Sequence, residues 1–272
     1  MALGTLRQAQ FRLFRLLEPR AIFEWQSFFA LRPLLSKFPK GDGHSVVVFP
    51  GFVSSDRATR PIRGLLQELG YDTHGWGLGT NLLFSNALES EMIALVNEVY
   101  ESTGKKVSLV GWSLGGIYAR EVAKACKGKI RSVVTLGSPI SGNTGHSHAH
   151  ALFKVLNGEP SKIDITRYQS LNTPPDVPTT SIYSKSDGIV AWEGSVQARG
   201  EFTENIEVPA SHLGMGVNPL ALYAVADRLA QPENNWRRFN NHGFKSLVYK
   251  KPSKKVHRKL FEDVVPSISP LD

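Results

Sequence analysis

The stretch from residue 107 to residue 126 constrains the fold of this chain more than any other. It reads VSLV, then GWSLGG, then IYAREVAKAC, which is a β-branched strand pattern, a glycine-rich turn and a helix pattern in succession. Glycines at 111 and 115 let the strand and the helix pack closely without Cβ clashes. We therefore predict that Ser113 lies on a strained turn, with its hydroxyl above a sheet and at the N-terminus of a helix.

Strand and helix patterns alternate through most of the rest of the chain. Strand patterns lie at residues 44–49, 71–74, 130–136, 179–183 and 205–208, and helix patterns at 62–69, 88–99 and 218–230. This alternation predicts an α/β fold with a mostly parallel sheet and helices on both of its faces. Residues 141–178 break the pattern, so we interpret them as a lid or cap insertion, with a surface insertion as the alternative.

A serine hydroxyl needs a general base, and the base needs an acid that orients it. Asp187 lies directly after the strand pattern TTSIY, at the edge of the sheet where catalytic groups collect. The other acids that we weighed for this role follow a strand less closely, and they are Asp164, Asp176, Glu193 and Glu201. His212 follows the last strand pattern and precedes the last helix pattern. We predict that Ser113, Asp187 and His212 form the catalytic group.

Hydrolysis also needs two N–H donors that face the developing oxyanion. The backbone N–H of Leu114, the residue after the nucleophile, is the first candidate. The turn after the strand pattern at 44–49 reads PGFV, and Gly51 there permits a close backbone approach. The backbone N–H of Phe52 is therefore the second candidate, and an ordinary strand-ending turn is the alternative.

With these residues identified, the chain resembles the α/β-hydrolase superfamily, and within it the lipase-like esterases. The resemblance covers residues 44–230, and its motifs are PGF at 50–52, GWSLGG at 111–116, VVTLGSP at 133–139, SKSDGIV around Asp187 and SHLGMGVNP around His212. Many bacterial lipases have His-Gly where this chain has Pro50-Gly51. The family also includes thioesterases, acyltransferases and peptidases, so the resemblance implies acyl transfer more firmly than it implies any particular acyl group.

Aromatic residues near the expected catalytic loops are candidates for substrate binding, and we predict this role for Trp112, Trp76 and Phe84. The alternative for each is an ordinary core position. No cofactor is expected, because a Ser-His-Asp group needs none. No metal site is expected either, since His146, His148 and His150 stand at two-residue spacing without nearby acids or cysteines.

The net charge of +8 comes from the two ends of the chain. Residues 1–40 hold seven Lys or Arg and two Glu, and residues 232–272 hold nine basic and four acidic residues. The remaining residues, 41–231, hold 16 basic and 18 acidic residues, so nothing in the middle favours a nucleic-acid partner. We predict an N-terminal amphipathic helical extension at 1–40, a catalytic domain at 41–231 and a basic tail at 232–272.

The N-terminal extension carries arginines on one side of a helical wheel and leucines on the other. Two interpretations stay open: the extension and the basic tail contact a lipid surface, or the extension packs its apolar face on the domain. The single cysteine, Cys126, and the absence of a long uninterrupted apolar run favour a cytoplasmic protein, either free or peripheral to a membrane.

The leading functional hypothesis is a serine esterase or lipase that acts on a small-molecule or lipid ester. An acyltransferase or thioesterase with the same catalytic group is the first alternative. A non-catalytic module that binds a membrane surface is the second.

Overall fold

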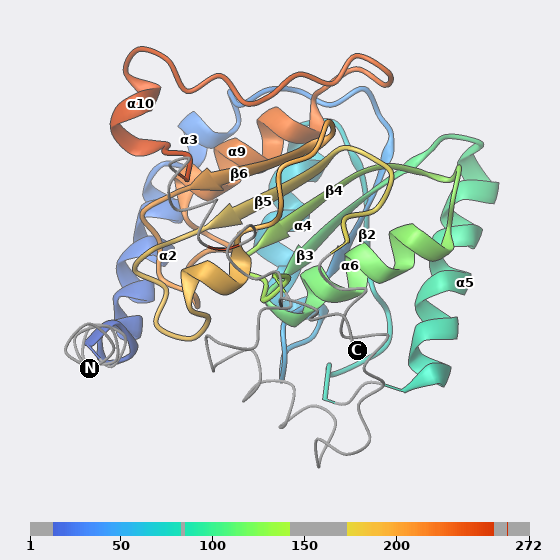
Figure 1. Cartoon of the computed structure of the whole chain (residues 1–272), viewed down its shortest axis with the longest axis horizontal. Coiled ribbons are helices and arrows are strands. Elements are labelled where there is room, and N and C mark those ends of the chain that lie inside the picture. Colours follow the sequence, from blue (N-terminus) through green and yellow to red (C-terminus); the bar gives the residue numbers. More distant parts are fainter. Residues whose placement is uncertain (1–12, 83–84, 142–172, 253–259, 261–272) are drawn as a thin grey trace, which may run out of the picture.

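Six parallel strands form the centre of the computed structural model (Figure 1), which describes residues 13–82, 85–141, 173–252 and 260 of the 272-residue chain. The strands lie in the order β2-β1-β3-β4-β5-β6, and each neighbouring pair is parallel. Their bounds are β1 Ser45–Phe49, β2 Asp72–Gly75, β3 Val107–Trp112, β4 Ile130–Leu136, β5 Thr179–Tyr183 and β6 Thr203–Glu207. The predicted parallel sheet is confirmed, and every predicted strand pattern overlaps an observed strand.

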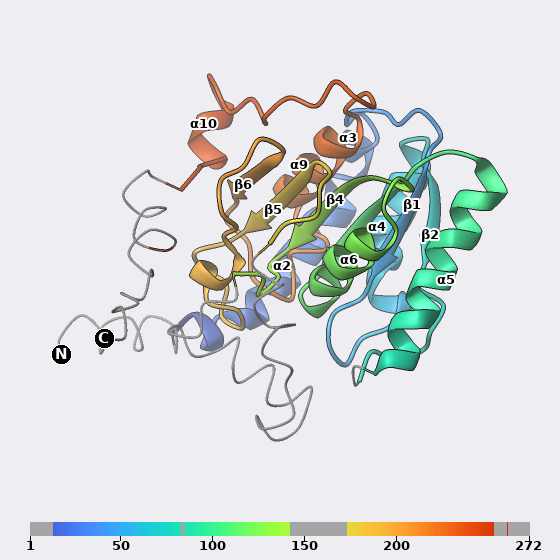
Figure 2. The ribbon, with the colours of Figure 1, turned by 45° about the vertical axis from the view of Figure 1, so that its right-hand side comes forward.

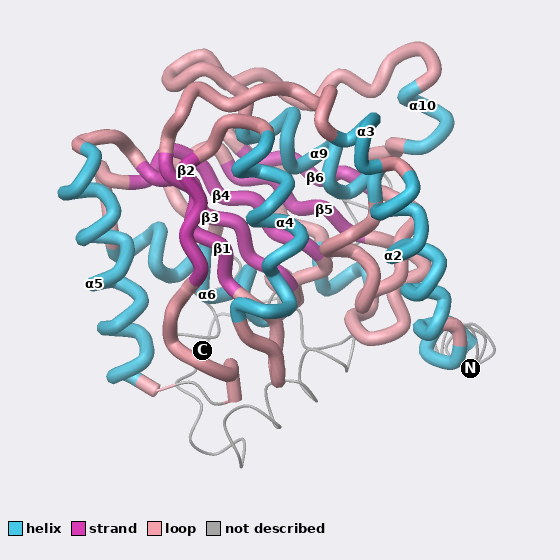
Figure 3. The backbone as a smooth tube through the Cα atoms, turned by 180° about the vertical axis from the view of Figure 1, so that it is seen from behind, coloured by secondary structure: helices cyan, strands magenta, loops and turns pink. Residues whose placement is uncertain are grey.

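Helices cover both faces of the sheet, as predicted. Their bounds are α2 Ala21–Ala30, α3 Arg32–Leu35, α4 Asp56–Glu68, α5 Asn86–Thr103, α6 Leu114–Ala125, α9 Pro219–Leu229 and α10 Lys245–Val248, with short 3-10 helices η1 Glu18–Arg20 and η3 Trp192–Ser195. On one face, α2, α3, α4 and α9 bury an apolar cluster against the strands (Figure 3). On the other face, α5 and α6 bury a second cluster (Figure 2). The N-terminal helices α2 and α3 therefore pack on the first of these two faces.

Local sequence signals explain where the long helices begin and end. The Ser85 hydroxyl accepts from the Leu88 N–H at the start of α5, and Gly104 ends that helix with a φ of 63°. The Asn218 side chain accepts from two N–H groups at the start of α9, and Pro219 occupies the first helical position. These caps fix where both helices begin and where α5 ends, while their apolar residues decide that α5 and α9 pack on opposite faces of the sheet.

Both ends of the described chain pack on the sheet-bearing body. Phe28 of α2 and Leu35 of α3 belong to the first apolar cluster, together with Phe239 and Tyr249 near the C-terminus. Residue 250 also forms a bridge with Glu207 at the end of β6. Residues 142–172, most of the predicted lid, lie outside the described residues. Within the described ranges, no helix is long and apolar enough to cross a membrane.

Candidate active site

The turn between β3 and α6 holds Ser113 in a rare backbone conformation. Its φ of 54° and ψ of −122° lie outside the regions that non-glycine residues normally adopt. A Cβ at Gly115 would overlap the carbonyl oxygen of Phe49 in β1, and one at Gly111 would overlap the backbone of α6. The Ser113 N–H donates to the Leu136 carbonyl at 2.8 Å, which attaches the turn to β4. The strained turn predicted from the glycine spacing is present.

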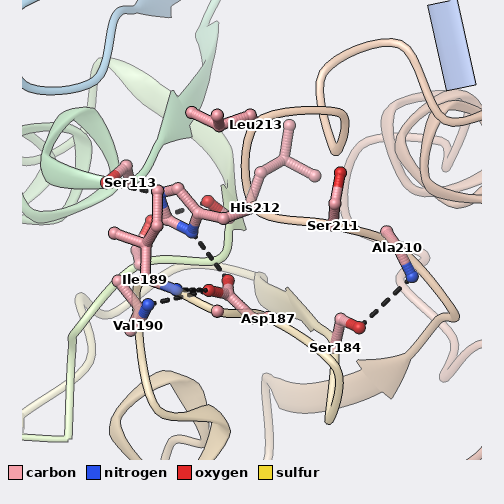
Figure 4. A network of polar contacts seen from close by, with 12 residues as sticks. Ser113, Ser184, Asp187, Ile189, Val190, Ala210, Ser211, His212 and Leu213 are labelled. Carbon is pink, nitrogen blue, oxygen red and sulfur yellow. Dashed lines mark hydrogen bonds and ion pairs between the residues drawn. The ribbon is translucent and has the colours of Figure 1, made fainter. Parts of the chain in front are cut away.

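The three predicted catalytic side chains meet above the ends of β3, β5 and β6 (Figure 4). The His212 Nε2 lies 3.0 Å from the Ser113 Oγ, and the His212 Nδ1 lies 2.7 Å from the Asp187 Oδ2. All three residues are buried. An ionised carboxylate only accepts hydrogen bonds, so the Nδ1 carries the proton and the Nε2 is free to accept one from the serine hydroxyl.

Two loops carry the acid and the base, and we name them the Asp187 loop (residues 184–190) and the His212 loop (residues 208–214). The Oδ1 of Asp187 accepts from the Ile189 and Val190 N–H groups at 2.8 and 2.7 Å, which fixes the carboxylate. The Ser184 hydroxyl accepts from the Ala210 N–H at 3.2 Å and so links the two loops (Figure 4). The carboxylate can therefore hold the His212 ring in one orientation.

The electrostatics of the site stabilise the imidazolium form of His212 relative to that of a free histidine. Burial lowers the pKa of His212, but the charge and hydrogen bond of Asp187, with the charge of Glu18, outweigh burial and raise the pKa above its ordinary value of 6.5. A base that is stabilised as an imidazolium can take a proton from a serine hydroxyl.

The two predicted oxyanion donors, Phe52 and Leu114, belong to segments that adjoin Ser113. Leu114 begins α6, directly after the serine. A Cβ at Gly51 would lie 3.2 Å from the Ser113 Cβ, so the predicted oxyanion loop (residues 50–54, called the oxyanion loop below) passes close to Ser113. Within the described part of the chain, neither the Phe52 nor the Leu114 N–H donates to a protein acceptor.

A buried asparagine that the sequence analysis missed holds the oxyanion loop. The Asn81 side chain donates to the Pro50 carbonyl at 2.9 Å, and its backbone exchanges hydrogen bonds with Val53 and Ser54. The Tyr118 hydroxyl of α6 donates to the Asn81 Oδ1 at 3.3 Å. Asn81 therefore connects the oxyanion loop to the helix that follows the nucleophile.

The three predicted substrate-binding residues have different surroundings. Trp112 is half-buried, and its indole N–H donates to the His212 carbonyl at 3.2 Å. Trp76 is buried in the second apolar cluster, where its indole N–H donates to the Gly79 carbonyl, so its ring has no free face for a substrate. Phe84 lies outside the described residues. Of the three, Trp112 alone is observed next to the catalytic group.

Each loop of the site exposes one large apolar side chain beside its functional residue. These are Val53, 61% exposed, Ile189, 39% exposed, and Leu213, 48% exposed. We call these three side chains the apolar rim. Solvent-exposed apolar side chains that share a site with polar catalytic groups are typical of sites for apolar ligands.

A second Ser, His and Asp string lies at the opposite edge of the sheet. His44 contacts the Asp42 Oδ1 at 2.5 Å through Nδ1 and the Ser108 Oγ at 2.9 Å through Nε2. Ser108 lies within β3, is fully buried and also contacts the Ser132 hydroxyl. Here burial lowers the pKa of His44, despite the hydrogen bond that its Nδ1 donates to Asp42. Asp42 and His44 line a surface cavity, but the serine of this string is fully buried within a regular strand.

In the portion of the chain that the structure describes, no three His, Cys, Asp or Glu side chains gather to hold a metal ion. His146, His148 and His150 lie outside that portion.

The N-terminal segment contributes polar side chains to the site, which the sequence analysis did not predict. Glu18, Arg20 and Glu24 each form hydrogen bonds with the catalytic loops. The sequence patterns gave no signal for these contacts, because their partners are mostly backbone groups more than 160 residues away.

No protein-family model matches the sequence. Among solved structures, lipase B from Aspergillus fumigatus aligns with a TM-score of 0.55 and 16% identity, over 73% of this chain and 55% of its own. A monoacylglycerol lipase from Paleococcus ferrophilus aligns with a TM-score of 0.50 and 16% identity, over 71% of this chain and 96% of its own.

An acylaminoacyl peptidase from Pyrococcus horikoshii aligns with a TM-score of 0.52 and 10% identity, over 75% of this chain and 39% of its own. Of the Aspergillus lipase described above, this chain spans about half the length. A likeness at these identities shows a shared fold.

Proposed function

Because this chain has the α/β-hydrolase fold, and because His212 contacts both Ser113 and Asp187, we propose that the protein is a serine hydrolase that cleaves carboxylic esters. The observation that carries the proposal is the 3.0 Å approach of the His212 Nε2 to a serine on a strained turn. The activity is that of an esterase or lipase.

In the proposed reaction, the Ser113 Oγ attacks the ester carbonyl carbon while the His212 Nε2 takes the hydroxyl proton. Asp187 holds the ring and stabilises the imidazolium. The N–H groups of Phe52 and Leu114 donate to the oxyanion, and removing one such donor in other serine hydrolases costs about 3 kcal/mol.

The tetrahedral intermediate collapses when the bond to the alcohol oxygen breaks and His212 returns the proton to that oxygen. Ser113 is left as an acyl ester. A water molecule then gives a proton to His212 and attacks the acyl carbonyl carbon. Collapse of the second intermediate releases the carboxylic acid and restores the serine hydroxyl.

The apolar rim supports an ester with an apolar acyl or alkyl group. Val53 adjoins the proposed donor Phe52, and Leu213 adjoins the proposed base, so an apolar chain can cover both while its carbonyl reaches Ser113. We expect kcat/KM to rise with acyl chain length in a p-nitrophenyl ester series.

A fluorophosphonate probe, which reacts with activated serines, tests the proposal. Labelling of the wild type should be lost in Ser113→Ala and kept in Ser108→Ala, which alters the second string and provides a matched control. Labelling that persists in Ser113→Ala, or no labelling of the folded wild type, would contradict the proposal.

The same catalytic group can pass its acyl group to an alcohol or accept it from a thioester. Comparing p-nitrophenyl esters, acyl-CoA and an added alcohol acceptor separates an esterase from a thioesterase or an acyltransferase. Transfer to the alcohol at low concentration, or turnover of acyl-CoA alone, would replace the esterase assignment with one of these.

We further propose that the outer face of α2 contacts an anionic lipid surface. This face exposes Ile22, Phe23, Trp25 and Phe29, while the one charged residue of the helix, Glu24, bonds inward to the His212 loop. The described acids of residues 13–40, Glu18 and Glu24, both contact the catalytic loops, and Arg15, Lys37 and Lys40 are exposed. An exposed apolar helix face, in a segment whose exposed charged side chains are basic, matches an anionic bilayer.

Sedimentation with phosphatidylglycerol vesicles tests this contact. Phe23→Ser with Phe29→Ser should weaken binding, while Phe244→Ser should not, although Phe244 is 91% exposed next to α10. Equal binding by all variants would contradict the proposal. A dimer in light scattering that is lost in the double variant would instead assign the face to a second copy of the chain.

A further inference from the structure

One oxygen of a buried glutamate joins the two catalytic loops. The Glu18 Oε1 accepts from the Gly188 N–H at 2.8 Å and from the His212 N–H at 3.0 Å. The other oxygen, Oε2, accepts from the Leu213 N–H at 3.0 Å. Gly188 follows Asp187 directly. The Glu18 carboxylate therefore bonds to the backbone beside the proposed acid and to the backbone of the proposed base, His212.

Neighbouring side chains of the same segment extend this connection. One nitrogen of Arg20 donates to the Ser186 carbonyl and hydroxyl and, at 3.2 Å, to the Ala210 carbonyl, so Arg20 also spans both loops. Glu24 accepts from the N–H and hydroxyl of Ser211 and from the Asn218 amide, and so contacts the His212 side alone.

The backbone of the N-terminal segment reaches the Asp187 loop as well. A Cβ at Gly188 would lie 2.5 Å from the carbonyl carbon of Phe14, so a glycine is needed for the segment to pack there. The segment therefore contacts the Asp187 loop directly, beside the hydrogen bond from Gly188 to Glu18.

We propose that Glu18 is a positioning residue of the catalytic site, which sets the separation of the Asp187 and His212 loops through its shared carboxylate oxygen. This inference rests on the proposed function. Glu18 does not touch the reacting atoms; it acts through the backbone at residues 188, 212 and 213. The segment that carries it, which the sequence suggested was an extension, is thus part of the catalytic architecture.

The carboxylate also places negative charge beside the imidazole. Besides His212, the described charged groups that lie in or bond to the two loops come from three places: Lys185 and Asp187 from the Asp187 loop, Glu207 of β6, which pairs with Lys185, and Glu18, Arg20 and Glu24 from the N-terminal segment. Of the three from that segment, Glu18 is the one whose charge contributes to raising the pKa of His212. Removing that charge should lower the pKa of His212.

Glu18→Gln tests the proposal, because it keeps the side-chain size but removes the charge and replaces one acceptor by a donor. We expect kcat to fall about 10- to 100-fold, from a small misplacement of His212 against Ser113, with little change in KM. The acid limb of kcat/KM should move to lower pH. Glu18→Asp keeps the charge, so it should lower kcat but leave the acid limb in place.

Two matched variants separate positioning from general damage. Glu24→Gln removes a carboxylate that contacts the His212 loop alone, and should lower kcat less and leave the acid limb unchanged. Glu68→Gln removes an exposed glutamate that pairs with Arg32, and should match the wild type. Kinetics are compared where near-UV circular dichroism shows each variant to be folded.

The pKa of His212, followed by NMR of the histidine-labelled protein with His212→Gln for assignment, gives a readout that needs no substrate. A Glu18→Gln protein with wild-type kcat and wild-type His212 pKa would overturn the proposal. The proposal would also be overturned if Glu24→Gln lowered kcat as much as Glu18→Gln does and moved the acid limb of kcat/KM by the same amount. If fluorophosphonate fails to label the wild type, the proposed function falls, while the NMR titration still decides the role of Glu18.

Discussion

Substitution of Gly115 by alanine tests whether close packing at the Ser113 turn depends on glycine. A Cβ there would overlap the Phe49 carbonyl oxygen and lie 2.7 Å from the Pro50 oxygen. Both are backbone atoms at the end of β1, so the helix and the strand must move apart. Overpacking of this kind costs roughly 1–3 kcal/mol, and we take about 3 kcal/mol because no side chain can rotate away.

Alanine is also favoured over glycine within a helix, by about 1 kcal/mol. The net loss for Gly115→Ala is therefore about 2 kcal/mol, or a Tm lower by roughly 4–8 °C for a domain of this size. Labelling by a fluorophosphonate should slow by about 100-fold as Ser113 shifts against His212.

Gly64→Ala is the matched control for this experiment. Gly64 lies within α4, and a Cβ there would meet nothing closer than an Arg32 nitrogen at 3.9 Å. The helix preference then acts alone and should stabilise the protein by about 1 kcal/mol. In thermal and urea unfolding, the free energies of unfolding of Gly115→Ala and Gly64→Ala should therefore differ by about 3 kcal/mol. Equal stability of the two variants would refute the packing argument.

Further predictions concern the catalytic groups and Asn81. Asp187→Asn should lower kcat by about 10⁴-fold, because an amide facing Nδ1 favours the wrong His212 tautomer; a loss below tenfold in ester hydrolysis would exclude this role. His212 must be neutral to act and its pKa is raised, so kcat/KM should fall with an acid midpoint above 6.5, and a pH–rate profile with a lower midpoint would contradict this. The raised pKa of His212 also contributes to the free energy of unfolding. This contribution is fully present below the unfolded-state pKa of 6.5, and it is lost as pH rises through the higher pKa of the folded state. Asn81→Ala leaves the buried Pro50 carbonyl without its donor, so urea unfolding should show a free energy of unfolding lower by about 1–3 kcal/mol. The kcat should also fall, because the Phe52 N–H is displaced. Unchanged stability and kcat would show that Asn81 does not hold the oxyanion loop.

The sheet and the meeting of Ser113, Asp187 and His212 could be predicted because both follow from local patterns. Buried parallel strands read as short β-branched runs, and their carboxyl ends meet at one edge of the sheet. A residue directly after a strand pattern is therefore placed in space by its position in the chain. The approach of Gly51 to Ser113 was predictable for the same reason.

Contacts to backbone groups could not be predicted in this way. Glu18 and Asn81 bond to main-chain N–H and C=O groups, which every residue carries, so no partner residue type marks them in the sequence. Trp76 shows the opposite difficulty. Its place beside a glycine-rich loop suggested substrate contact, but burial of its ring and a local carbonyl partner make it a core residue.

The two Ser, His and Asp strings show what distinguishes a site from a coincidence of residue types. Corresponding distances in the two strings are nearly equal: the histidine-to-serine distances are 2.9 and 3.0 Å, and the histidine-to-aspartate distances are 2.5 and 2.7 Å. Ser108 lies in a regular strand with its hydroxyl covered by Ser132, whereas Ser113 lies at a turn with positive φ between a strand and a helix. The difference lies in the backbone, because only the second serine follows the end of its strand, where the oxyanion loop and the catalytic loops converge. Glycine spacing predicts that backbone, which is why the sequence indicated Ser113.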